Sequence, residues 1–231
     1  MKRFYKSAEA VFAGEGYGIS LDGRPVKTPG RRGLILPSAA LAAAIVTEWN
    51  TSQGDIRPAE MSLTQIANTA IDRVMPQRAA VVQHIAGYAG TDLVCYRATR
   101  PPALASRQQS IWQPLVDWAV LRYDAPLEVT VGVIPITQPP ASLHALAAAV
   151  AQHDDFALAA LHLATAACGS LIIALALVEG RLDADEAFAA SQLDESFQIE
   201  GWGEDTEQAR HRQALAGDIA AAAQFLSLLR T

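Results

Sequence analysis

The chain has 231 residues, of which 51% are hydrophobic, and its formal net charge at pH 7 is −6. This length suits one large domain or two modest ones, and the apolar content excludes a disordered chain. The acidic balance argues against a protein that holds nucleic acid by its phosphate backbone, because such proteins present a clustered basic face.

The first third of the chain has the pattern of short strands. Residues 17–29 contain two β-forming runs around Asp22-Gly23, a dipeptide that tolerates the positive φ of a hairpin turn. Residues 33–38 predict another strand, and Ser38 is a suitable N-cap for a helix over 39–53.

From Leu63 onward the apolar spacing is helical, and the sequence predicts these segments as helices: 63–74, 76–88, 106–124, 141–152, 156–178, 183–202 and 206–229. Pro114 lies inside one of them, where we expect a kink or the start of a helix. Residues 127–133 alternate in polarity and predict an isolated strand or hairpin arm. The predicted fold class is α+β, with a β-rich N-terminal domain over 1–65 and a larger helical domain over 66–231.

The segment Phe156–Val178 contains no charged residue and is long enough to span a bilayer. Alanine supplies much of it, and its flanks lack the Lys/Arg cluster that orients a membrane helix. We therefore expect a buried helix, or two helices joined near Gly169. A peripheral membrane protein that uses this segment is the less favoured alternative.

Sequence signals for chemistry are weak. There is no nucleophile elbow and no phosphate-binding P-loop, and none of the five histidines belongs to an H-E-x-x-H motif. Cys95 and Cys168 form no C-x-x-C, so we expect buried thiols in a reducing compartment. We expect no cofactor and no metal. His162 suits a protein core, and His211 suits a solvated face.

The stretch "SQLDESFQIEGWGED", residues 191–205, is dense in acids and carries Phe197, Ile199 and Trp202. Asp194 and Glu195 project about 100° apart on a helix, so they cannot flank one reacting atom unaided. A solvated helix end explains the acids, and a docking surface explains both the acids and the apolar residues. On a helix, Glu195 and Ile199 share one side, as do Asp194, Phe197 and Trp202. An enzyme whose site joins this stretch to His84 or His211 across a domain cleft remains the runner-up.

Several segments together resemble one known family, in their order and spacing: "GYGISLDGRPVKTP", "LPSAALAAAIVTEW", "MSLTQIANTAID", "YAGTDLVCYRA", "IWQPLVDWA", "GSLIIALAL" and "SQLDESFQIEGWGED". The chain resembles the assembly chaperone of the ATP synthase F(1) sector that acts on the α subunit. Gln113 and Cys168 depart from the family pattern, where an acid and a threonine are more usual.

The resemblance implies a two-domain architecture, no catalytic activity, and binding of the unassembled α subunit so that its β-facing surface stays covered. It implies that the partner-binding residues lie in the acidic stretch: Glu195 first, then Asp194, Glu200, Trp202, Glu204 and Asp205. Mitochondrial members act in the matrix and carry a presequence, whereas this chain starts almost directly at "KRFY". We therefore expect a bacterial cytoplasmic protein. From its acidic charge and from the composition of residues 156–178, we also expect that it binds no nucleic acid and has no stable membrane insertion.

Overall fold

The computed structural model describes residues 2–51 and 54–230. The chain forms two compact units, which we call the N-terminal unit and the helical unit. The N-terminal unit comprises Met1–Arg78, Asp154–Ala160 and Ala221–Thr231, and the helical unit comprises Ala79–His153 and Leu161–Ala220. A small strand-rich region precedes a larger helical region, so the predicted α+β class is confirmed. The predicted domain boundary between residues 65 and 66 stays a prediction.

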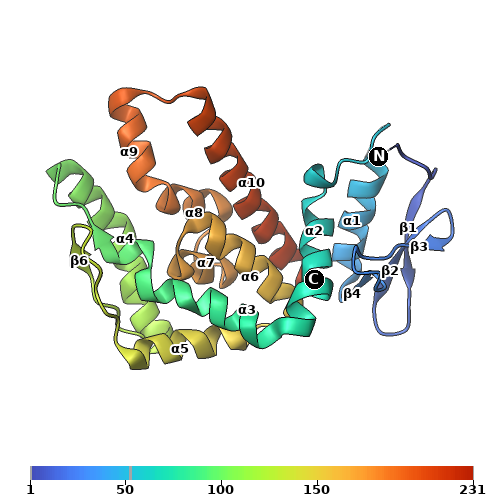
Figure 1. Ribbon diagram of the computed structural model, residues 1–231, viewed down its shortest axis with the longest axis horizontal. Helices are drawn as coiled ribbons and strands as arrows, with labels where there is room; N and C mark the ends of the chain where they lie inside the picture. Colours follow the sequence, from blue (N-terminus) through green and yellow to red (C-terminus); the bar gives the residue numbers. More distant parts are fainter. Residues whose placement is uncertain (1, 52–53, 231) are drawn as a thin grey trace. The chain divides into compact units, whose positions relative to one another are not determined.

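The sheet of the N-terminal unit has β2 at its centre (Figure 1). Its strands are β1 (Ala8–Phe12), β2 (Tyr17–Leu21), β3 (Arg24–Pro25) and β4 (Ile35–Leu36), and β2 pairs antiparallel with each of the others. Asp22 and Gly23 have φ angles of 47° and 80°, as a two-residue hairpin turn with positive φ at both positions requires. The hairpin predicted at this dipeptide is therefore confirmed.

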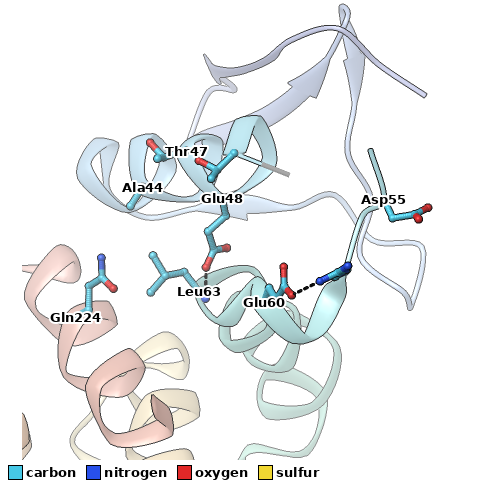
Figure 2. A pocket seen from close by; sticks show the side chains of 9 residues that line it. Ala44, Thr47, Glu48, Asp55, Glu60, Leu63 and Gln224 are labelled. Atoms are coloured by element: carbon cyan, nitrogen blue, oxygen red, sulfur yellow. Dashed lines mark hydrogen bonds and ion pairs between the residues drawn. The ribbon is translucent and has the colours of Figure 1, made fainter. Parts of the chain in front are cut away.

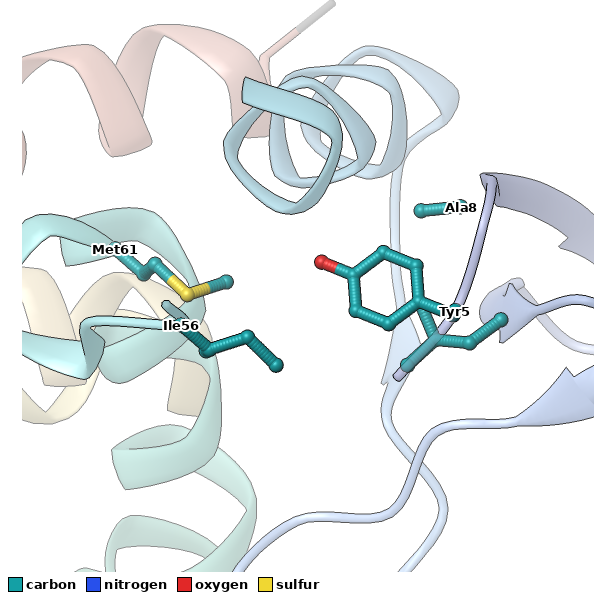
Figure 3. Packing of buried hydrophobic residues seen from close by; sticks show 5 residues of the cluster. Tyr5, Ala8, Ile56 and Met61 are labelled. Atoms are coloured by element: carbon teal, nitrogen blue, oxygen red, sulfur yellow. The ribbon is translucent and has the colours of Figure 1, made fainter. Parts of the chain in front are cut away.

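Helix α1 (Ala39–Thr51) packs against β1 and β2. It starts as predicted, because the Ser38 hydroxyl accepts a hydrogen bond from the Leu41 N–H at 3.1 Å. The last two residues of the predicted helix, 52 and 53, lie outside the described residues. A buried cluster joins Tyr5, Ala8 and Leu21 of the sheet region to Ile56 and Met61 (Figure 3).

The helices that follow are α2 (Ser62–Thr69), the π-helical turn η2 (Ala70–Val74) and α3 (Met75–Gly87). Short 3-10 turns lie at η1 (Pro58–Glu60), η3 (Tyr88–Thr91) and η4 (Leu93–Cys95). Glu48 of α1 anchors the start of α2, because its carboxylate accepts the N–H groups of Leu63 and Thr64 at 2.8 and 2.9 Å.

The remaining helices are α4 (Pro102–Tyr123), α5 (Pro140–Ala151), α6 (Asp155–Cys168), α7 (Leu171–Val178), α8 (Ala184–Ser191), α9 (Leu193–Trp202) and α10 (Thr206–Leu229). Helix α4 starts at Pro102 and continues through Pro114, so the alternative of a helix that starts at Pro114 is wrong. The last helix has the predicted bounds.

The apolar segment Phe156–Val178 forms α6 and α7, which are joined at Gly169 with a φ of 62°. Every residue of α7 is buried, and the Ser170 hydroxyl caps it by accepting the Ile173 N–H at 3.0 Å. Of the two predicted alternatives, two helices joined near this glycine is the one confirmed. Across the described residues, no helix combines the length and hydropathy needed to cross a bilayer.

Two predicted elements need correction. The helix expected over 183–202 is two helices, because Gln192 leaves helical geometry with φ −106° and ψ 24°. The break lies where the indole N–H of the buried Trp112 donates to the Ala190 carbonyl at 2.8 Å, a contact that no local pattern reveals. The strand expected over 127–133 shortens to β6 (Thr130–Val131), which pairs in parallel with β5 (Tyr96–Arg97).

Candidate functional site

Helix α9 carries most of the predicted site residues, and one of its faces is occupied by α4. The Asp194 carboxylate accepts a hydrogen bond from Gln108 Nε2 at 2.7 Å. Arg107 donates to both oxygens of Glu200, at 2.6 and 2.9 Å, and its guanidinium lies 5.2 Å from the centre of the Phe197 ring. The hydrogen bonds from Arg107 lower the pKa of Glu200 below its usual value. These three residues of α9 therefore hold it against α4.

Asp194 also belongs to a buried polar network. Gln108 is buried, and its side-chain oxygen accepts the Ala98 N–H at 2.7 Å. Its backbone carbonyl accepts from Arg97 at 2.6 Å, and Arg97 lies over the ring of Trp112. Burial lowers the pKa of Arg97. Asp194 is thus linked through Gln108 to the segment after β5. Its carboxylate therefore stabilises the packing of α9 against α4.

Arg212 of α10 contacts residues 191–205 at positions that do not face α4. Its Nε lies 3.2 Å from a carboxylate oxygen of Glu204, and one terminal nitrogen donates to the Ser196 hydroxyl at 3.1 Å. The same guanidinium lies 5.2 Å from the centre of the Phe188 ring. One arginine therefore connects α8, α9 and the turn before α10.

Asp205 caps α10. One carboxylate oxygen accepts the N–H groups of Glu207 and Gln208, at 2.8 and 2.9 Å. The acid satisfies donors that a helix start leaves without partners, and its charge suits that end of the helix dipole.

A different side of α9 carries Glu195, Ile199 and Trp202, which we call the α9 outer face. Glu195 and Ile199 are half-buried, and the Trp202 side chain is 86% exposed. Within residues 2–51 and 54–230, Glu195 has no hydrogen-bond or ion-pair partner, unlike the other four acids of the stretch. Gly203, with a φ of 83°, ends the helix directly after Trp202.

The structure corrects one grouping within the stretch. We expected Trp202 on the side of Asp194 and Phe197, and those two residues face α4. Trp202 follows Glu195 by about two helical turns, which returns it to the side of Glu195. The α9 outer face thus carries one carboxylate and two apolar side chains on the same side of the helix. Protein–protein interfaces combine polar and apolar groups in this way.

The histidines do not join this stretch. The His84 ring lies 5.2 Å from the His162 ring and 5.8 Å from the Tyr88 ring, while His211 is exposed on α10. In the described part of the chain, neither His84 nor His211 forms a hydrogen bond with an acid of residues 191–205. Residues 2–51 and 54–230 contain no group of three or more His, Cys, Asp or Glu side chains that could hold a metal ion.

The two cysteines are buried free thiols, as predicted. Burial raises the pKa of each thiol to about 12, and the nearby Asp92 adds to the effect. A thiol with such a pKa is not a nucleophile at neutral pH.

The N-terminal unit contains a groove of about 740 Å³ between α1, the turn before α2 and the end of α10 (Figure 2). Its acids include Glu48, which anchors α2, and Glu60, which pairs with Arg57 at 3.0 Å. Glu48 is therefore hydrogen-bonded to the backbone of α2, and Glu60 belongs to an exposed ion pair.

The comparisons with known proteins agree on a family. The family model described as ATP12 chaperone protein matches residues 2–120. The crystal structure of Atp12 from Paracoccus denitrificans is 44% identical, with a TM-score of 0.94 over 99% of this chain and 98% of that one. A variant of the same protein with one aspartate replaced by lysine matches at 43% identity, with the same TM-score and coverage.

A candidate chaperone of Agrobacterium tumefaciens is 39% identical, with a TM-score of 0.94 over 99% of this chain and 86% of that one. The matches cover nearly the whole chain at identities well above those that show a fold alone. The chain therefore belongs to the ATP12 chaperone family.

Proposed function

We propose that this chaperone assists assembly of the ATP synthase F(1) sector in the bacterial cytoplasm by binding the unassembled α subunit. It covers the β-facing surface of that subunit until the α/β pair forms, and it catalyses no reaction. Family membership supports the chaperone role, and the segments that carry the resemblance support the choice of partner. The observation that carries the proposed site is the α9 outer face, where Glu195 has no hydrogen-bond or ion-pair partner among the described residues and Trp202 is exposed.

The physical reason is that an α subunit without its neighbours exposes apolar surface that aggregates. A chaperone must cover this surface and later release it. Negative charge steers the encounter and disfavours wrong partners, while a modest apolar area limits the strength of binding. The α9 outer face supplies both features on one helix.

In this proposal the predicted binding residues divide into three roles. Glu195 and Trp202 contact the α subunit directly. Glu200 and Glu204 are exposed, but each forms an ion pair with an arginine of the same chain, so they add less negative potential around the contact than Glu195 does. Asp194 and Asp205 hold α9 and the start of α10 in place.

Reversing the charge at Glu195 tests the site. We expect Glu195→Lys to weaken capture of unassembled α subunit about tenfold or more, because a like charge would face the basic part of the partner. Glu128→Lys makes the same change at an exposed acid outside α9 and is the matched control. Capture is measured by pull-down, with circular dichroism to confirm folding. Equal capture by the Glu195 variant and the wild type would remove Glu195 from the site.

Trp202 tests the apolar half of the same face. Because its side chain is 86% exposed, Trp202→Ala should change the free energy of unfolding by less than about 0.5 kcal/mol. Capture of the α subunit should weaken about tenfold or more, as expected when a central tryptophan is lost from an interface. Leu121→Ala, at an 88% exposed position on α4, is the control. If both variants capture normally, Trp202 does not contact the partner.

A further inference from the structure

The N-terminal unit contains a second, smaller pocket, separate from the groove of Figure 2. Its volume is about 290 Å³, and its lining is mainly apolar, with Val26, Trp49, Ile56 and Met61 among the wall residues. Ile56 and Met61 also belong to the buried cluster of Figure 3, so the pocket adjoins the core of this unit. Three of the segments that carry the family resemblance line this pocket: those around Val26, Trp49 and Asn68.

The walls of the pocket are fixed by hydrogen bonds. The Tyr5 hydroxyl donates to the Trp49 carbonyl at 2.6 Å, and the Thr64 hydroxyl donates to the Glu48 carboxylate at 2.7 Å. Thr28 is held in the same way by Asp72, at 2.7 Å. A pocket with such walls is preorganised, which lowers the entropic cost of filling it.

Two lining residues carry buried polar atoms that have no hydrogen-bond partner within the described residues. They are the indole nitrogen of Trp49, a donor, and the side-chain oxygen of Asn68, an acceptor. A buried polar group without a partner costs free energy, and most such groups in folded proteins are paired. One donor and one acceptor together match a peptide group, which offers a carbonyl oxygen and an N–H.

The size and charge of the pocket narrow the class of ligand. A volume of about 290 Å³ lies at the lower limit of ligand pockets, which begin at about 300 Å³, and so favours a single side chain over a nucleotide. Among the described residues that line it, Lys27 is the only charged one, so none of them supplies a carboxylate that would attract a cationic ligand.

We propose that this pocket binds one apolar residue of a partner polypeptide. The apolar side chain fills the space between Trp49 and Met61. The carbonyl of the bound residue accepts from the Trp49 indole, and an adjacent N–H donates to Asn68. The inference rests on the proposed function only in taking a polypeptide as the partner, and it places a second contact in the N-terminal unit, whereas α9 belongs to the helical unit.

The direct test uses N-acetyl-L-leucinamide as the probe, with the indole N–H resonance of Trp49 as the readout in the full-length protein. Trp49→Phe assigns this resonance. N-acetylglycinamide lacks the side chain, and methyl 4-methylpentanoate keeps it but lacks the N–H donors. We expect a saturable shift with a dissociation constant on the order of 1–10 mM for the leucinamide, and about fivefold weaker binding for the other two compounds.

No saturable shift with the leucinamide would overturn the proposal. Equal binding of the ester would also overturn it, because the pocket would then recognise apolar surface alone. These arms need no variant that could fail to fold. Asn68→Ala adds a test of the acceptor: leucinamide binding should weaken about fivefold, whereas Gln83→Ala, at an exposed position on α3, should leave it unchanged.

Pull-down of the α subunit separates this inference from the proposed function. If the wild type binds leucinamide as expected but ignores the α subunit, the proposed partner is wrong and the pocket stands. If the wild type captures the α subunit but binds none of the leucinamide, the pocket proposal fails alone.

Discussion

Individual contacts decide which acids of residues 191–205 remain open to a partner. Asp194, Glu200, Glu204 and Asp205 each bind a group of the same chain, and Glu195 has no such partner within the described residues. A carboxylate that is half-buried and unpaired loses part of its hydration without compensation. Binding of a basic group at Glu195 would supply that compensation, which gives this residue its place in the proposed site.

Asp92 is a carboxylate outside the proposed site whose pKa is strongly raised. It is fully buried, and it accepts hydrogen bonds from the Ser170 hydroxyl at 2.6 Å and from the N–H groups of Ile172 and Val94 at 3.1 and 3.2 Å. Burial raises its pKa from 3.8 to about 6, although these hydrogen bonds oppose the change. The protonated form is therefore the one that folding favours.

This raised pKa predicts a pH dependence of stability. Protonated Asp92 stabilises the folded protein, and this contribution is fully present below pH 3.8. It is lost as the pH rises through about 6, because the folded protein then buries a charged carboxylate. Relative to Asp92→Asn, which does not titrate, the wild type should lose up to about 3 kcal/mol of unfolding free energy across this range. Urea denaturation of both proteins between pH 4.5 and 7.5 measures the difference. A difference that stays constant with pH would contradict the assignment.

Among the helices, the start of α8 is set by local sequence. The Asp183 carboxylate accepts the Glu186 N–H at 2.8 Å, and the Glu186 carboxylate accepts the Asp183 N–H at 2.9 Å. This capping box satisfies two backbone donors reciprocally. Since α8 leads directly into α9 after Gln192, its start also helps to fix the helix that carries the proposed site.

Removing the cap tests this role. Asp183→Ala should lower the free energy of unfolding by about 1 kcal/mol, because the Glu186 N–H loses its acceptor at the start of the helix. Gln198→Ala, at an exposed position of α9, should change it by less than about 0.5 kcal/mol. Chemical denaturation at pH 7 compares them. Equal stabilities of the two variants would show that the capping box does not hold α8.

For the molecule as a whole, the elements that the sequence predicts correctly are those with local signals. The turn at Asp22-Gly23 and the joint at Gly169 both need positive φ, which these residue types tolerate. Helix α10 begins where it was predicted to begin, and Asp205 caps that end. The break at Gln192 and the parallel pairing of β6 depend on distant residues, so local patterns could not reveal them.

The proposed site was predictable as a stretch and not as a set of contacts. Its composition identified residues 191–205, but Arg107 lies 93 positions before Glu200, and Gln108 lies 86 positions before Asp194. Only the fold shows that Arg107 forms an ion pair with Glu200 and that Gln108 donates a hydrogen bond to Asp194. The pocket beside Trp49 was missed because its walls come from residues spread between Val26 and Asn68, which no local pattern groups together.

The central claim is that Glu195 lies at the surface that holds the α subunit. A photoreactive amino acid at position 195, introduced into the full-length protein in cells, tests it most directly, with position 128 as the matched control. We predict that irradiation links position 195 to the unassembled α subunit and that position 128 gives no such product. Abundant α subunit with no product from position 195, while assembly proceeds normally, would contradict the account.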